Sequence, residues 1–311
     1  MSAGAATPPV RRRWARTPPL SRVGARTVLI RGSMLLVLAV CVGYGITNVV
    51  WAATDWQLPD VDAYWGAATR LAAGEALYPP VPDVNAPDVY RYAPWFAIAW
   101  MPLTLLPRPV VDGLWSAALI AASLAVVLPV LWRRRRASTA FAALLGGFLV
   151  LIASRGNVQP LMVAALAFGV ERRSGPIWIA ACASLKATPI FFVMVYVIRG
   201  EWRRAALTMA LTAVLVLPML AFGIKDYPTD PGSSSSLYAL SPALYWLVAL
   251  SSVVVGSYIA WRHRRWAWLA AAVAVILCLP RFFPYEFTFL FVGLIPVADA
   301  WRERRVGREP A

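Results

Sequence analysis

The chain has 311 residues, of which 60% are hydrophobic and only 14% are charged, so it is too apolar for an ordinary soluble domain. In a soluble protein its net charge of +15 would suggest a nucleic-acid partner. Here the arginines cluster between long apolar segments, which favours basic loops retained on the cytoplasmic side of a membrane. We therefore expect a multi-pass protein of the plasma membrane without a nucleic-acid partner.

The N-terminal segment is basic and rich in proline. Residues 1–32 carry seven arginines and no acid, which is typical of a disordered cytoplasmic tail, since the basic region of a signal peptide is shorter. Residues 33–53 follow as a retained membrane span, and residues 302–311 form a second cytoplasmic tail. Between the tails, residues 33–301 are expected to form one transmembrane domain, with residues 54–91 as its first outer loop.

Arginine clusters recur along the rest of the chain. If each cluster is cytoplasmic, every interval between two clusters crosses the bilayer an even number of times. This parity predicts helical hairpins formed by residues 33–53 with 110–132, 137–153 with 158–170, 205–222 with 242–261, and 266–280 with 285–300. The expected fold is all-α: a polytopic transmembrane bundle of about 8–10 membrane segments, with short outer-face helices in the first outer loop and both termini cytoplasmic.

Residues 174–198 are too short for a full hairpin. At 1.5 Å per residue they reach about 37 Å, enough for one crossing of a ~30 Å hydrocarbon core but not for two. Two half-helices that meet at Lys186-Ala-Thr-Pro189 would satisfy the parity. The alternative is one broken span over residues 140–170 and one full span over 174–198, which would leave Arg172 and Arg173 outside. We favour the half-helices.

Acidic residues play no part in placing these spans and therefore test the topology. The segments assigned to the cytoplasm hold 23 of the 30 basic residues and 5 of the 15 acidic residues. The remaining segments hold 7 basic and 10 acidic residues. Two-thirds of the acids thus fall on the outer side, which supports the assignment.

The outer end of each predicted hairpin carries polar residues. The first outer loop holds six acids, and the later turns hold Ser154-Arg-Gly-Asn-Val-Gln159, Lys186, Lys225-Asp226 and Arg281-Phe-Phe-Pro-Tyr-Glu286. Ionisable groups at membrane depth are costly, so by default they mark a functional site. Lys186 alone could snorkel to an interface, and Arg155 or Arg281 alone could be a plain loop charge. Together these cations suit a site for an anionic lipid.

Asp60 and Asp62 form a D-x-D pair, although two solvated loop acids would give the same pattern. In soluble sugar transferases such a pair binds a metal ion and a nucleotide diphosphate. Nucleotide sugars are normally absent outside the cell, so a lipid-linked donor is the simpler expectation. One carboxylate would then act as general base toward an acceptor hydroxyl. No resident cofactor is indicated, and a divalent ion is compatible with the pair but not indicated by it.

Several motifs occur in a characteristic order: Asp60-Val-Asp-Ala-Tyr64 through Gly74-Glu-Ala-Leu-Tyr78, Tyr90-Arg-Tyr-Ala-Pro94 leading to Met101-Pro-Leu103, Gly156-Asn157 with Gln159, and Leu185-Lys186 with Pro189. In this order they resemble the GT-C superfamily, specifically glycosyltransferase family 87, the polyprenyl-phosphate-dependent mannosyltransferase type. The resemblance covers about residues 30–205 well and the C-terminal third by hydropathy alone.

The resemblance implies an inverting transferase that moves mannose or another hexose from a polyprenyl-phosphate donor to a hydroxyl of a glycan, lipid or protein acceptor at the outer face. By position, Asp60 resembles the catalytic base, and Asp62 is a second catalytic candidate. Lys186 resembles a lysine near the donor phosphate. The other expected substrate-binding residues are Tyr64, Tyr92, Arg155, Asn157, Gln159 and Arg281. Outside the resemblance, Glu286 is a candidate from its chemistry alone, as is Arg281.

Two other functions fit the same pattern. A transporter or flippase of lipids or lipid-linked sugars would use the same pocket for an anionic lipid, although the internal inverted repeats and mid-membrane acids common in transporters are not apparent. An inactive, transferase-like protein could serve as an assembly partner. Its role would then survive substitution of Asp60 and Asp62.

Overall fold

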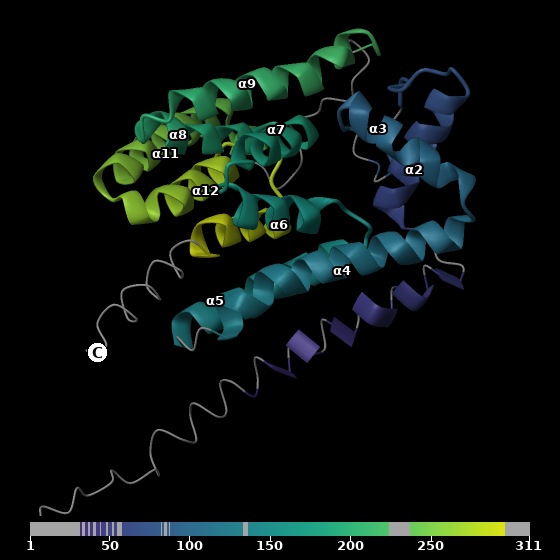
Figure 1. Ribbon diagram of the computed structural model, residues 1–311, viewed down its shortest axis with the longest axis horizontal. Coiled ribbons are helices and arrows are strands. Elements are labelled where there is room, and N and C mark those ends of the chain that lie inside the picture. Colours follow the sequence, from purple (N-terminus) through teal and green to yellow (C-terminus); the bar gives the residue numbers. More distant parts are fainter. Residues whose placement is uncertain are drawn as a thin grey trace, which may run out of the picture.

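A computed structural model describes residues 58–132 apart from 82, 84, 85 and 87, residues 136–223 and 237–295, and some residues between 32 and 54 (Figure 1). Every regular element of these described residues is a helix, as the sequence predicts. Several predicted features lie outside the described residues, namely both terminal tails (residues 1–31 and 302–311), Asp55, the arginines at 133–135 and the Lys225-Asp226 turn.

In the described part of the chain, three helices are long and apolar enough to cross a membrane. They are α4 (Arg108–Trp132), α9 (Trp202–Val216) with its continuation η3 (Leu217–Leu220), and α11 (Pro242–Arg262). These helices confirm the helical segments predicted over 110–132, 205–222 and 242–261. Only 17% of the apolar window of α9 and 22% of that of α11 is buried. Both helices therefore turn most of their apolar side chains away from the protein.

Shorter apolar helices fill the space between the long ones. They are α5 (Arg136–Ala153), α6 (Gln159–Gly169), α7 (Gly175–Leu185), α8 (Val193–Ile198), α12 (Ala267–Leu277), and η6 (Pro284–Phe289), which continues as helix to residue 295. A helix of 11 residues, such as α6, α7 or α12, reaches about 16 Å, roughly half of a hydrocarbon core. Two short helices, α10 (Leu237–Leu240) and η5 (Arg264–Trp266), lie directly before and after α11.

The chain reverses direction at Lys186. Helix α7 ends at Leu185, Lys186 has an extended backbone (φ −138°, ψ 121°), and the short helix η2 (Thr188–Phe192) leads into α8. The hydroxyl of Tyr196, near the end of α8, donates to the carbonyl of Val170, just before α7, at 2.6 Å. The end of α8 therefore lies beside the start of α7. This geometry agrees with the half-helix hairpin and disagrees with a single full span over residues 174–198.

Short helices lie within and just after the segment predicted as the first outer loop, residues 54–91. Helix α2 (Pro59–Ala72) is followed by α3 (Pro94–Trp100) and η1 (Met101–Leu105), which pack together beside the start of α4 (Figure 1). Proline stands in the first turn of α2 and α3, as it does in α6, α7 and α11. Its fixed φ suits that position, and its missing N–H has no partner to lose there.

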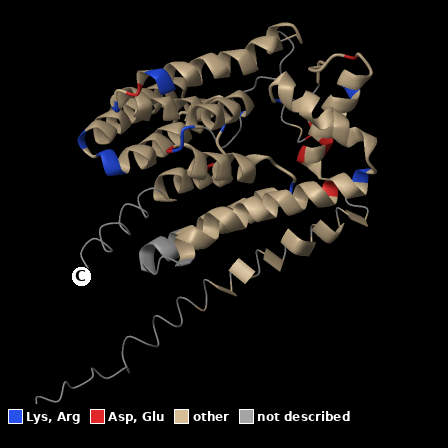
Figure 2. Ribbon diagram, viewed as in Figure 1, with Lys and Arg blue, Asp and Glu red and all other residues tan. Residues whose placement is uncertain are grey.

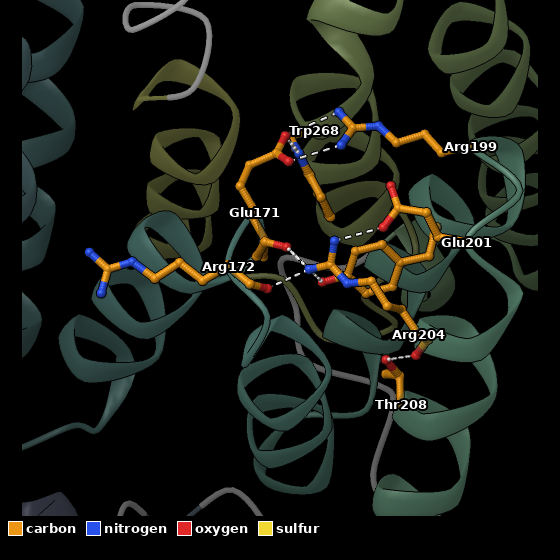
Figure 3. Close-up of polar contacts among 9 residues, drawn as sticks. Glu171, Arg172, Arg199, Glu201, Arg204, Thr208 and Trp268 are labelled. Atoms are coloured by element: carbon orange, nitrogen blue, oxygen red, sulfur yellow. Dashed lines mark hydrogen bonds and ion pairs between the residues drawn. The ribbon is translucent and has the colours of Figure 1, made fainter.

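A network of charged side chains joins the arginine-rich turns (Figure 3). The carboxylate of Glu171, between α6 and α7, accepts from Arg199 at 2.9 and 3.1 Å and from the indole N–H of Trp268 in α12. Arg204 of α9 donates to the carbonyl of Val170 at 2.8 Å. Because α6, α7, α8 and α12 each have one end in this network, their other ends all lie on the opposite side of the helical body. Figure 2 shows Lys and Arg at the turns near this end and acidic residues on α2 and the start of α4.

Candidate functional site

Asp60 lies in the first turn of α2 and is held against the turn between α5 and α6. Its backbone N–H donates to the carbonyl of Arg155 at 3.2 Å, and its Oδ1 accepts from the Asn157 amide at 2.9 Å. Gly156 makes this close approach feasible. Its φ is +79°, and a Cβ there would lie 2.5 Å from Cγ2 of Val61. Glycine is the residue that adopts this backbone conformation without strain.

The orientation of the Asn157 amide follows from its second hydrogen bond. The backbone N–H of Gln159 donates to Oδ1 of Asn157 at 2.9 Å. A backbone N–H can only donate, so the oxygen of the amide faces Gln159 and its NH₂ group faces Asp60. Oδ1 of Asp60 is therefore held as an acceptor. Among the described residues, Oδ2 of Asp60 receives no hydrogen bond.

The side chain of Gln159 continues the network to Lys186 and Glu286. Its Oε1 accepts from Nζ of Lys186 at 2.9 Å, and its Nε2 donates to Oε2 of Glu286 at 3.2 Å and to Oγ1 of Thr288 at 3.3 Å. Lys186 and Glu286 form an ion pair of 2.6 Å, in which the glutamate side chain is 3% exposed. Asp60, Asn157, Gln159 and Lys186, predicted as site residues from three separate motifs, are thus joined in one chain of contacts, which Glu286 completes.

The protonation of Asp60 reflects a balance between burial and nearby cations. Burial raises the pKa of Asp60 from 3.8 to about 6, while the hydrogen bond from Asn157 and the charges of Lys186, Arg155 and Arg91 act in the opposite direction. Burial disfavours the charged carboxylate, whereas donors and positive charges favour it. The result is a carboxyl group that is mainly ionised at neutral pH and remains basic enough to accept a proton.

Asp62 belongs to a different contact. Its carboxylate pairs with Arg108 at 2.7 Å, and Arg108 also pairs with Asp112 at 2.7 Å, one turn further along α4. The guanidinium lies over the ring of Trp65, 5.2 Å from its centroid. The two carboxylates of the D-x-D pair therefore have separate partners. No group of three or more potential metal ligands occurs among the described His, Cys, Asp and Glu residues.

Tyr64 and Tyr92 lie in the core beside the site. Tyr64 is completely buried within an aromatic cluster that includes Tyr92, Phe96, Trp100 and Trp115. Its hydroxyl accepts from the backbone N–H of Val158 at 3.2 Å and donates to that of Tyr92 at 3.3 Å. These contacts fix α2 against the turn that carries Asn157. A direct contact of either tyrosine with substrate stays a prediction.

Arg155 and Arg281 lie in the two turns that border this network. Arg155 is exposed, and its charge acts on Asp60. Arg281 is half-buried, with its guanidinium over the ring of Phe283 at 5.1 Å from the centroid. Phe283 in turn stacks on Tyr285, with ring centroids 5.4 Å apart and planes 6° apart. The Nε atom of Arg281 is buried without a hydrogen-bond partner among the described residues.

Sequence patterns alone did not identify Thr288 or Tyr285 as parts of the network around Lys186, or Arg108 as the partner of Asp62. Arg108 and Asp112 stand four residues apart at the start of a predicted helix, a spacing that places two side chains on one face. That spacing could have predicted their ion pair. The pattern offers no comparable indication for Thr288, which reaches Gln159 across 129 positions.

No protein-family model, curated protein or solved structure matches the chain. The resemblance to glycosyltransferase family 87 therefore depends on the sequence motifs alone.

The roles of Asp62 and Arg108 can be separated by stability measurements. Because Asp62 is 31% exposed, D62N should cost only about 1 kcal/mol or less of unfolding free energy. R108M should cost about 3 kcal/mol or more, because it leaves the Asp112 side chain, 2% exposed, without a partner. Denaturant unfolding in detergent measures both, with E75Q on the exposed surface as control. Equal losses of unfolding free energy for D62N and R108M would contradict the role of Arg108 as the ion-pair partner that stabilises buried Asp112.

Proposed function

We propose that the protein is a membrane hexosyltransferase of the GT-C type, which transfers mannose or another hexose from a polyprenyl-phosphate donor to a hydroxyl acceptor with inversion at the anomeric carbon. The observation that carries the proposal is the state of Asp60: one carboxylate oxygen is held by Asn157, the other receives no hydrogen bond from the described residues, and the charges of Lys186, Arg155 and Arg91 act on the group. Asp60 belongs to the first of the motifs that resemble glycosyltransferase family 87, and Asn157, which donates to it, belongs to another.

The proposed location is the plasma membrane. Its support is the three helices long and apolar enough to cross a bilayer, together with the exposed apolar faces of α9 and α11. Soluble proteins rarely expose large contiguous apolar patches. The remaining short helices would complete a bundle of about 8–10 membrane segments, with both termini and the arginine-rich turns on the cytoplasmic side by the positive-inside rule. Asp60 then faces the outer side.

The chemical step needs one base and one leaving group. Oδ2 of Asp60 accepts the proton of the acceptor hydroxyl while that oxygen forms a bond to the anomeric carbon of the donor sugar. The bond from the anomeric carbon to the phosphate oxygen breaks, and its electron pair leaves with the polyprenyl phosphate. Attack opposite the leaving group inverts the configuration. The step requires no redox chemistry, and a glycan, a lipid or a protein hydroxyl would serve equally as acceptor.

Transport of a lipid or lipid-linked sugar is a second candidate. The observation that favours it is the half-helix hairpin formed by α7 and η2–α8, because interrupted helices often line the binding sites of transporters. Chemistry separates the two functions. A transporter moves a labelled lipid across the bilayer unchanged, whereas a transferase yields a glycosylated acceptor and free polyprenyl phosphate.

Substitution of Asp60 tests the transferase function. D60N and D60A should lower sugar transfer from polyprenyl-phospho-mannose by about 10²–10⁴-fold, the usual cost of losing a general base. D88N is the matched control, because Asp88 is an exposed aspartate of the same predicted loop. Transfer is measured with radiolabelled donor in membranes, with folding checked by size-exclusion chromatography. Full transfer activity of both Asp60 variants would exclude the residue as base. No sugar transfer by the wild-type protein, together with normal function of both variants in vivo, would favour a transporter or an inactive assembly partner.

The pH dependence of transfer tests the environment of the same carboxylate. A base with a pKa of about 6 is protonated at lower pH, so the rate should fall about tenfold per pH unit below 6 and reach a plateau above 7. N157A removes a hydrogen bond that lowers this pKa, so its acidic limb should move to higher pH. Initial rates between pH 4.5 and 8.5 show both effects. An acidic limb near pH 4 in the wild-type protein would instead indicate a solvated carboxylate.

A further inference from the structure

The proposed donor carries a phosphate, and the motif resemblance would place Lys186 next to it. The contacts that Lys186 makes within the protein do not support this placement. Its ammonium group has three N–H donors. One donates to Oε1 of Glu286 at 2.6 Å and one to Oε1 of Gln159 at 2.9 Å. The ring of Tyr285 covers the group from a third side, with its centroid 4.8 Å from Nζ. The binding capacity of this cation is already used within the protein.

Releasing Lys186 to bind a ligand would leave Glu286 without its counter-ion. The glutamate side chain is only 3% exposed, and its other oxygen accepts from the Gln159 amide. An ionised carboxylate in so buried a position is costly once its partner is removed. A phosphate brought to Lys186 would also meet the negative charge of Glu286 directly. Both effects oppose phosphate binding at Lys186.

Arg155 and Arg281 are in the opposite situation. Neither forms an ion pair with a carboxylate among the described residues, and Nε of Arg281 has no hydrogen-bond partner there. Each lies in a turn that contributes to the network around Asp60: the carbonyl of Arg155 accepts the Asp60 N–H, and Arg281 precedes Glu286 in the last turn. A guanidinium group offers a planar fork of donors that matches two oxygens of a phosphate.

A stack of groups fixes Arg281 relative to the buried ion pair. Its guanidinium lies over Phe283, Phe283 stacks on Tyr285, and Tyr285 covers Nζ of Lys186. The ion pair thus supports the stacked rings of Phe283 and Tyr285, and the guanidinium of Arg281 lies on this stack. Removing the pair would disturb the position of Arg281, while replacing it by an uncharged pair that keeps the packing would not.

We propose that the phosphate of the donor binds to Arg155 and Arg281, and that Lys186 is the internal counter-ion of Glu286, a positioning residue rather than a phosphate ligand. This assignment rests on the proposed function for the identity of the donor. The ligand chemistry is a phosphate group, either on a lipid or free in solution.

Binding of a short polyprenyl phosphate to the detergent-purified full chain, followed by calorimetry, tests the assignment. R155Q and R281Q should each weaken binding by about tenfold or more, the usual cost of losing a hydrogen bond between charged groups, with an unchanged unfolding temperature. R173Q, at the opposite end of the helical body, is the matched control and should bind like the wild-type protein. Inorganic phosphate as competitor distinguishes a free phosphate from a lipid phosphate as the preferred ligand.

The ion pair is tested by a double-variant cycle. K186M and E286Q should each lower the unfolding temperature, because each leaves a buried polar group unmatched. The double variant K186M/E286Q should recover most of this loss, since the amide of E286Q can donate to Oε1 of Gln159. It should also bind the polyprenyl phosphate within about threefold of the wild-type affinity, a factor worth under 1 kcal/mol.

Several results would overturn the proposal. One is a double variant that regains stability but binds as weakly as R281Q, because Lys186 would then contact the phosphate. Wild-type binding by both arginine variants, or no binding by the wild-type protein, would do so as well. The assay involves no sugar transfer, so it is independent of the proposed activity. Normal phosphate binding without transfer to any acceptor would refute the transferase and leave the arginine assignment intact.

Discussion

Charged side chains of the short helices are confined to the helix ends, and the arrangement of the described chain depends on this constraint. An ionised group in an apolar interior is costly unless it is paired and hydrogen-bonded. Helices α6, α7, α8 and α12 therefore carry apolar residues along their length and meet polar groups at their turns. One end gathers Glu171, Arg199 and Arg204, and the other gathers Asp60, Lys186 and Glu286. The candidate site lies where the first turn of α2 meets the connections before α6, after α7 and before η6.

Sequence reasoning could predict this architecture because charge and hydropathy repeat along the chain. Parity between arginine clusters predicted the helical segments and the reversal at Lys186, and the described helices agree with the segments and with the reversal. Among these described helices, three are long and apolar enough to cross a membrane. It could not predict which charges pair, since pairing depends on distances across 100 residues or more of chain, as for Lys186 with Glu286. The D-x-D spacing does not reveal the partners of Asp60 and Asp62, yet Arg108 holds the second and Asn157 the first. Tyr64 also matches a motif, but only the structure reveals its complete burial.

The groups of the candidate site differ in their exposure and in the contacts they make. Buried pairs and amides, such as Glu286 with Lys186 and Gln159 with Asn157, fix geometry, because their donors and acceptors are matched to one another. Asp60 and Arg155 lie nearer the surface, and Oδ2 of Asp60 receives no hydrogen bond from the described residues. In the proposed function, preorganisation of this kind would let the Asp60 carboxylate act as a base without reorganising its surroundings during the reaction.

In the proposed topology, the end of the helical body that carries Asp60 faces the outside of the cell. Site-directed labelling tests this most directly: in a background free of Cys41, Cys182 and Cys278, single cysteines replace exposed Glu75 and exposed Arg173. A membrane-impermeant maleimide applied to intact cells should label the cysteine at position 75 at once and that at position 173 only after permeabilisation. Labelling of position 173 in intact cells, with position 75 protected, would contradict the account.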